Sequence, residues 1–189
     1  MTNFPILSSL ILIPTIGSIF LLFIKSTEKN NSIKYVALFT SLINFFLSLY
    51  LWKLFDNNIS DFQFVETRIW IKNFINYKVG VDGISMLFII LATFITPLCI
   101  ISVNNHVKIR LKEFLIAILL METLMIGVFC SLDLIIFYLF FEGGLIPMFL
   151  IIGIWGGNRR VYSAFKFFLF TLVGSVLMLI AIIYIYWLS

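Results

Sequence analysis

One carboxylate in the middle of a long apolar segment is the residue best placed to do chemistry. Glu142 follows Phe137-Tyr138-Leu139-Phe140-Phe141 and precedes Gly143-Gly144-Leu145-Ile146-Pro147. If a membrane-spanning helix begins near Asp133, Glu142 lies about nine residues, or ~13 Å, inside it. A charge buried at that depth costs roughly 2.5–3.5 kcal/mol, so the side chain needs a partner, water or a proton path. We therefore predict that Glu142 transfers protons; the alternative is an acid that only holds helices together.

The residues after this acid suggest a local irregularity in its helix. Gly143 and Gly144 have no side chains and allow a neighbouring helix to approach closely. Pro147 cannot donate a backbone hydrogen bond and weakens the helical ladder one turn later. We expect these three residues to form a helix break and a packing site beside Glu142.

Two further ionisable side chains lie within apolar runs. Glu122 is about nine residues into the preceding run, which the chain crosses in the opposite direction. Both acids should therefore lie near the middle of the membrane, at similar depth. Two such carboxylates on antiparallel neighbours could relay protons; the alternative is a protonated Glu122, hydrogen-bonded within the bundle. Lys166 lies one turn into the last run, where it either extends to the membrane surface or tunes Glu142 or feeds the proton path.

The remaining candidates favour structural roles. Asp82 and Asp133 each precede an apolar run and are predicted to cap helix N-termini. Cys99 and Cys130 lie in apolar runs without metal-ligand spacing and are predicted to be small buried hydrophobic residues. His106 is the single histidine, so the chain cannot supply two histidine ligands to a haem. No redox cofactor or metal is expected to bind to this chain.

Composition requires lipid as the solvent for most of the chain. Of its 189 residues, 62% are hydrophobic and 12% are charged, whereas soluble domains carry about 25% charged residues. Six apolar runs approach the roughly 20 residues that a spanning helix needs. They cover residues 5–24, 35–55, 83–104, 113–131, 133–154 and 163–188. The sequence therefore predicts an all-α, polytopic transmembrane bundle.

Charges in the connections predict the orientation of this bundle. Basic residues occupy the first, third and fifth connections: Lys25, Lys29, Lys34, Lys108, Arg110, Lys112, Arg159 and Arg160. The short fourth connection has none, and the second, 56–82, is mixed in charge. The positive-inside rule then places both termini outside, on the periplasmic side of the cell inner membrane. Since the basic residues are not clustered on a polar domain, the net charge of +4 does not indicate nucleic acid binding.

The long second connection, 56–82, is rich in aromatic and branched residues and is not predicted to be disordered. Either a short strand pair or an interfacial helix would explain it. In both cases Trp70 is expected at the level of the lipid headgroups.

Three stretches of the sequence resemble a known family. Gly80-Val81-Asp82-Gly83-Ile84-Ser85 opens the third run, and Phe137 to Gly157 contains Leu145-Ile146-Pro147-Met148. Ala164-Phe165-Lys166-Phe167-Phe168 follows. Together they resemble the antiporter-like membrane subunits of respiratory NADH–quinone oxidoreductase (complex I), and most closely the subunit M, or mitochondrial chain 4, family. The resemblance is good from about Tyr77 to Leu179.

The resemblance implies a role in proton translocation. The family's key glutamate on the fifth span maps onto Glu142. In the family it pairs with a lysine on the seventh span. NADH, FMN, iron–sulfur clusters and quinone would be bound by other subunits. Other membrane-arm subunits, antiporter-like neighbours and lipid would be the partners, in the inner membrane of a cell or a mitochondrion.

The family fold has about fourteen helices with two inverted five-helix repeats, whereas this chain contains six runs. The seventh-span lysine and the second repeat are absent, so we expect a fragment, a split-gene product or a second chain that supplies them. We divide the chain into a three-span region, 1–112, and the start of a proton-translocation repeat, 113–189. A subunit of a sodium/proton antiporter or membrane-bound hydrogenase is one alternative function. A structural or vestigial fragment without transport is another.

Overall fold

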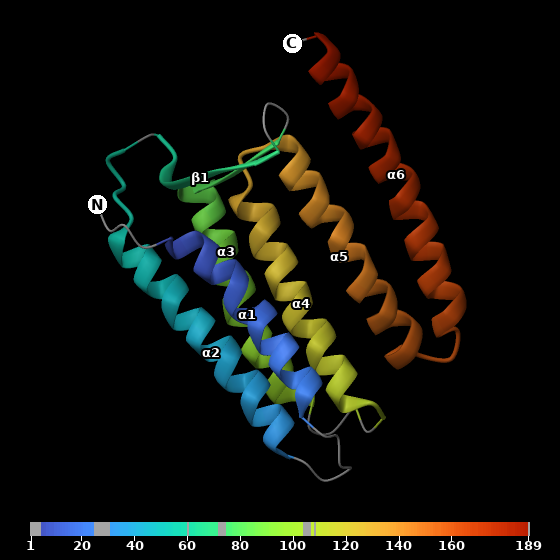
Figure 1. The fold of residues 1–189 in the computed structure, drawn as a ribbon. Coiled ribbons are helices and arrows are strands. Elements are labelled where there is room, and N and C mark those ends of the chain that lie inside the picture. The colour runs from blue at the N-terminus through green and yellow to red at the C-terminus, as the bar shows by residue number, and fades with distance from the viewer. Residues whose placement is uncertain are drawn as a thin grey trace.

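Six helices account for most of the protein (Figure 1). The computed structural model describes residues 5–24, 31–59, 61–71, 75–103, 107 and 109–188. Each helix is long and apolar enough to cross a membrane. The helices are α1 (Ile6–Phe23), α2 (Asn31–Leu54), α3 (Gly83–Ser102), α4 (Leu111–Cys130), α5 (Leu134–Trp155) and α6 (Arg160–Leu188). All six predicted runs are confirmed; α2 and α6 begin a few residues earlier than predicted.

Helices α1 to α4 form the centre of the bundle, and the last two are added on one side. α1 packs against α2 and α4, and α3 packs against α2 and α4. α5 packs against α4, and among the described elements α6 packs against α5 alone (Figure 1). Accordingly, α6 buries only Ala164 and Ser175. Because the helix number is even, α1 begins and α6 ends at the same end of the bundle.

An antiparallel hairpin is the non-helical element of the described chain. It consists of β1 (Gln63–Ile71) and β2 (Ile75–Val81). The strand pair predicted for the second connection is therefore confirmed, and the interfacial helix is wrong. Alternating aromatic and branched residues suit a half-buried strand, which explains the outcome. The side chain of Trp70 lies outside the described part of the chain, so its position at the headgroups stays a prediction.

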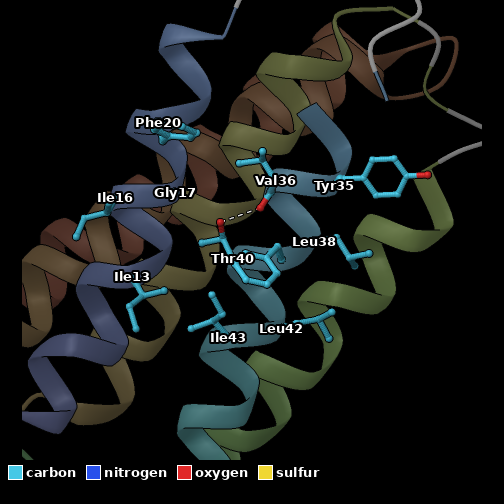
Figure 2. A pocket seen from close by; sticks show the side chains of 11 residues that line it. Ile13, Ile16, Gly17, Phe20, Tyr35, Val36, Leu38, Thr40, Leu42 and Ile43 are labelled. Carbon is cyan, nitrogen blue, oxygen red and sulfur yellow. Dashed lines mark hydrogen bonds between the residues drawn. The ribbon is translucent and has the colours of Figure 1, made fainter. Parts of the chain in front are cut away.

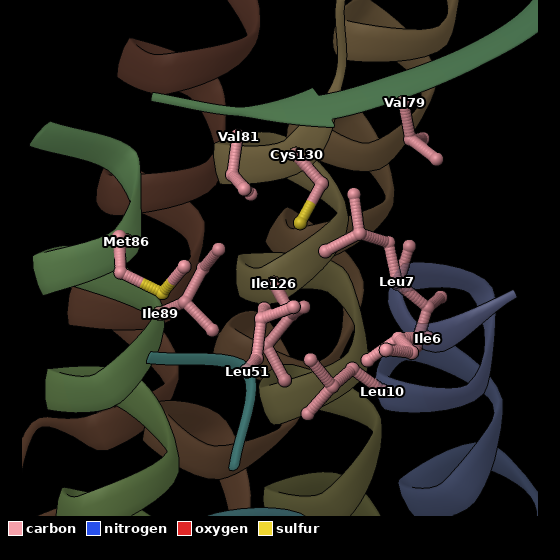
Figure 3. Packing of buried hydrophobic residues seen from close by; sticks show 11 residues of the cluster. Ile6, Leu7, Leu10, Leu51, Val79, Val81, Met86, Ile89, Ile126 and Cys130 are labelled. Atoms are coloured by element: carbon pink, nitrogen blue, oxygen red, sulfur yellow. The ribbon is translucent and has the colours of Figure 1, made fainter. Parts of the chain in front are cut away.

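The hairpin is hydrogen-bonded to the turn between α4 and α5. The backbone N–H of Leu132, in that turn, donates to the carbonyl of Lys78 on β2 at 3.0 Å. Val79 forms an isolated antiparallel bridge with Ser131. Val79 and Val81 are fully buried against side chains of α1, α3 and α4 (Figure 3). The hairpin thus fixes the level at which α4 ends and α5 begins.

A glutamate from the hairpin caps the first helix. α1 has no side-chain cap of its own at Pro5. The Glu66 carboxylate instead accepts hydrogen bonds from the backbone N–H of Leu7 at 2.8 Å and of Ser8 at 3.1 Å, and from the Ser8 hydroxyl. It satisfies donors that the helix leaves free at its N-terminus and interacts favourably with the helix dipole.

Local acids cap the third and fifth helices, as the sequence predicts. Asp82 forms a capping box with Ser85, and the hydrogen bond from the Ser85 backbone N–H lowers the pKa of Asp82. Asp133 accepts from the backbone N–H of Ile135 at 2.9 Å and of Ile136 at 3.2 Å. Helices α1, α3 and α5 therefore all begin at the hairpin end beneath a carboxylate.

Basic side chains cap these same three helices at their other ends. Each comes from the first turn of a neighbouring even-numbered helix, namely α4 for α1, α2 for α3 and α6 for α5, and donates to carbonyls that lack intrahelical donors. The bonds are Lys112 to Leu22 and Ile24 at 2.8 Å each, Lys34 to Ile101 at 3.4 Å, and Arg160 to Ile154 at 2.7 Å. Three other predicted topogenic charges, Lys25, Lys29 and Lys108, lie outside the described residues.

Replacing Glu66 by alanine should destabilise the protein by about 1–2 kcal/mol, because α1 loses its N-terminal acceptor. The measurement is thermal unfolding of the purified protein in detergent. Asp61→Ala is the matched control, since Asp61 is an exposed acid in the same connection. Equal midpoints for the two variants would contradict the capping role.

Candidate functional site

The two acids within spans lie at the same level of the bundle. Glu122 is eight residues before Cys130, the last residue of α4, and Glu142 is eight residues after Leu134, the first residue of α5. At 1.5 Å per residue, both are roughly 12 Å from the hairpin end of their helices. The similar depth expected from the sequence is therefore present in the structure.

Glu122 is buried between the central helices. Its side chain is 1% exposed. Nδ2 of Asn44 on α2 donates to Oε1 of Glu122 at 2.8 Å. Among the described residues, Oε2 of Glu122 and Oδ1 of Asn44 are buried without a hydrogen-bond partner. Glu122 is thus hydrogen-bonded within the bundle, and its part in a proton relay stays a prediction.

Glu142 is half-buried on the side of α5 that faces α6. At 100° per residue it shares one helix face with Phe149 and Gly153. The ring of Phe149 packs against that of Phe165 on α6 with centroids 5.4 Å apart. A Cβ on Gly153 would lie 3.5 Å from the Cβ of Ala164. Oε2 of Glu142 is buried, and no described residue is its hydrogen-bond partner.

The pairing of α5 with α6 separates Lys166 from this acid. Gly153 lies against Ala164 and Phe149 against Phe168, so the antiparallel register puts Ser175 level with Glu142. Ser175 is 2% exposed on a helix that is otherwise largely exposed. Lys166 is exposed and nine residues earlier in α6, roughly 13 Å away along the axis. Within the described chain, no ion pair joins it to either acid.

Close contact between α4 and α5 holds the two acids in place. A Cβ on Gly127 would lie 2.4 Å from the ring of Phe140, and one on Gly143 would lie 3.0 Å from Leu124. Gly144 faces open space. Of the two predicted packing glycines beside Glu142, Gly143 is therefore the one in tight contact.

The predicted helix break at Pro147 does not interrupt α5, which is continuous from Leu134 to Trp155. Pro147 is buried inside the helix and has no N–H, so the carbonyl of Gly143 loses its usual donor. Membrane helices tolerate such a proline because packing against neighbours maintains the helix. The irregularity is thus one missing hydrogen bond next to Glu142.

The cysteines differ from one another. Cys130 is buried, as predicted, whereas Cys99 is exposed on α3. The prediction for Cys99 is wrong because apolar sequence alone does not tell a lipid-facing position from a core position. The described residues contain no group of three or more His, Cys, Asp or Glu side chains that could hold a metal. His106 lies outside them.

One apolar groove near the N-terminus lies away from both acids. It is a cavity of about 700 Å³ between α1 and α2, lined by residues such as Ile13, Phe20 and Leu42. Figure 2 shows that the Thr40 hydroxyl, which lines it, bonds back to the carbonyl of Val36 on the same helix. The groove offers no ionisable group besides Tyr35 and is not a candidate site.

The family profile described as "NADH-ubiquinone oxidoreductase chain 4, amino terminus" matches residues 9–128. The chain belongs to this family. A second profile, "NADH:quinone oxidoreductase/Mrp antiporter, TM", matches residues 131–189 and so includes Glu142. The resemblance seen in the sequence motifs is confirmed. The division of the chain at residue 112 stays a prediction.

Curated members of the chain 4 family match nearly the whole chain. "NADH-quinone oxidoreductase subunit M" of Rhodobacter capsulatus is 58% identical over 153 residues, which are 81% of this chain and 30% of the relative. "NADH-ubiquinone oxidoreductase chain 4" of Marchantia polymorpha is 49% identical over 95% of this chain and 37% of its own length. "NADH-quinone oxidoreductase subunit M" of Rickettsia conorii is 44% identical over 98% of this chain, which corresponds to 39% of the relative's own length. The chain thus spans less than two fifths of these relatives.

Sequence reasoning missed Asn44, the partner of Glu122. Asn44 lies in the apolar run of α2, and an amide in such a run is a signal of an intramembrane hydrogen bond. Asn44 carries no charge, so a search for charged residues in apolar runs does not find it. The 78 residues between the partners also hide their contact from any local pattern.

Replacing Gly127 by alanine should destabilise the protein by about 1–3 kcal/mol, because the new Cβ would overlap the ring of Phe140. Gly144→Ala is the matched control and should be neutral or slightly stabilising, since its Cβ meets nothing and alanine favours the helix. Thermal unfolding in detergent measures both. A Gly127 variant as stable as the control would contradict the close approach of α4 and α5.

Proposed function

We propose that this chain is a segment of the membrane arm of a proton-translocating NADH–quinone oxidoreductase, in which Glu142 carries protons. The observation that supports this most directly is a buried carboxylate oxygen of Glu142, eight residues inside α5, that has no hydrogen-bond partner among the described residues. A carboxyl in that position is costly unless it exchanges protons or meets a charged partner. Family membership supplies the context, since the relatives are named as subunits of this oxidoreductase.

In this proposal Glu142 alternates between a protonated and an ionised form. Its proton would leave or return as a cation or water approaches the carboxyl. A lysine from a further helix, as the family resemblance implies, would be such a cation. The freed carbonyl of Gly143 adds a hydrogen-bond acceptor next to the acid, which a water molecule could use.

Glu122 and Lys166 would support this centre from a distance. Glu122 lies at the same depth on the neighbouring helix and could accept or supply a proton. Lys166 would act through its charge alone, by about 1 kcal/mol over ~13 Å at an effective dielectric constant of 20.

The rest of the machinery is proposed to lie in other subunits. NADH, FMN, iron–sulfur clusters and quinone would react there, and conformational or electrostatic changes would reach Glu142 through neighbouring membrane-arm subunits. The complex would lie in the inner membrane of a bacterium or mitochondrion, with the N-terminal and C-terminal ends of this chain both on the outer side.

A second candidate function is cation/proton antiport in a multisubunit antiporter, or a related hydrogenase. The profile that matches residues 131–189 is named for both the oxidoreductase and the Mrp antiporter. Both functions need the same buried acid, so the chemistry of the site does not separate them. Sodium-driven proton movement without NADH oxidation by the purified assembly would favour the antiporter, and the reverse would favour the oxidoreductase. A structural fragment without transport is a third candidate, which the next experiment also tests.

Glu142→Gln in the assembled complex should lower NADH-driven proton translocation at least about tenfold, because glutamine cannot release a proton. Protons moved per electron, measured in sealed vesicles, give the result. The matched control is Glu113→Gln, an exposed acid in the first turn of α4, which should leave the ratio unchanged. An unchanged ratio in the Glu142 variant would refute the assignment.

A further inference from the structure

Polar side chains gather around Glu122 where the first four helices meet. Asn44 bonds to Glu122 at 2.8 Å. One helix turn along α2, the Ser48 hydroxyl lies 2.8 Å from that of Thr93 on α3. Next to Glu122, the Thr123 hydroxyl lies 3.0 Å from that of Thr15 on α1. Three polar contacts thus connect α1, α2, α3 and α4 in the interior.

Two cavities approach this cluster from opposite ends of the bundle. One, of about 440 Å³, is lined by Glu122 and by Thr96, Cys99 and Ser102, which lead along α3 to its C-terminal end. The other, of about 830 Å³, is lined by Thr123 and Thr15 and extends past Ser8 to Tyr77 and Arg68 on the hairpin. Since Glu122 and Thr123 are adjacent in sequence, the two cavities end on neighbouring residues of α4.

Glu122 and Asn44 lack one hydrogen-bond donor between them, and a proton on the Glu122 carboxyl would supply it. The Asn44 amide donates to one carboxyl oxygen, while the other carboxyl oxygen and the amide oxygen are both buried acceptors that no described residue supplies with a donor. A proton on Oε2 of Glu122 supplies the missing donor, and Oδ1 of Asn44 is the acceptor of the same amide. Besides Glu122, the described residues that line the two cavities include three ionisable side chains. They are Arg68 at the hairpin and two weak acids, Tyr77 and Cys99.

We propose that Glu122 is a second proton-binding site, held as a neutral carboxylic acid in a reciprocal pair with Asn44 and exchanging its proton with water through the two cavities. Asn44 is the positioning residue of this site. The site is separate from Glu142, because Glu122 faces α2 and α3 whereas Glu142 faces α6. Its use in translocation rests on the proposed function, but its protonation and its access to water do not.

Infrared spectroscopy of the purified membrane assembly tests the proposal, because a protonated carboxyl has a C=O band that an ionised one lacks. Glu122→Gln should remove one such band. Asn44→Leu should move the band to higher frequency, since its C=O no longer accepts a hydrogen bond. In D₂O the wild-type band should move to lower frequency as the carboxyl proton exchanges.

Glu113→Gln is the matched control and should leave this region of the spectrum unchanged. A Glu122→Gln spectrum that loses a carboxylate band instead would overturn the neutral acid, and a band unaltered by Asn44→Leu would overturn the pair. A wild-type band that does not move in D₂O would overturn the access to water. The wild-type measurement in D₂O requires no variant to fold. The infrared test reports on the carboxyl of Glu122, whereas the proton ratio of the Glu142→Gln variant reports on the proposed function, so a failure of one is distinct from a failure of the other.

Discussion

This bundle depends on hydrogen-bond partners for the backbone groups at the ends of three parallel helices. Each helix leaves backbone donors free at its start and acceptors free at its end, and lipid offers no substitute. Helices α1, α3 and α5 begin at the hairpin end, where Glu66, Asp82 and Asp133 accept their free N–H groups. Basic side chains from the even-numbered helices cap the opposite ends. The capping acids and the capping bases therefore lie at opposite ends of the bundle.

This constraint gives the charge pattern of the connections a second physical cause. Basic residues in the odd connections were interpreted from the sequence as signals of orientation. Lys34, Lys112 and Arg160 also complete helix C-termini, so the fold needs them at that end whichever side of the membrane it faces. Glu122 and Glu142 are exceptions to this pattern, because they lie far from any helix start and, within the described residues, accept no backbone hydrogen bond. Their burial without such donors is the reason for our proposal that they take part in proton chemistry.

Local features of the fold could be predicted from sequence, and long-range contacts could not. Length and apolarity give the six spans, and the two residues Asp82 and Asp133 precede their helices directly. The strand pair of 56–82 stayed open, since its composition suits two structures. Glu66 caps a helix 59 residues away, and Asn44 meets Glu122 across 78 residues, which no periodicity reveals. The sequence leaves open whether Lys166 tunes Glu142, because the register of α5 with α6, which separates the two residues along the helix axis, is not a local feature.

The central claim is that the carboxyl of residue 142 lies within the hydrocarbon, away from bulk solvent. The most direct test is the depth of a spin label on Glu142→Cys, measured by its collisions with oxygen and with a water-soluble nickel complex in lipid vesicles. The account predicts frequent collisions with oxygen and few with nickel, unlike a label at the exposed position Glu113. Equal nickel accessibility at the two positions would place residue 142 at the membrane surface and contradict the account.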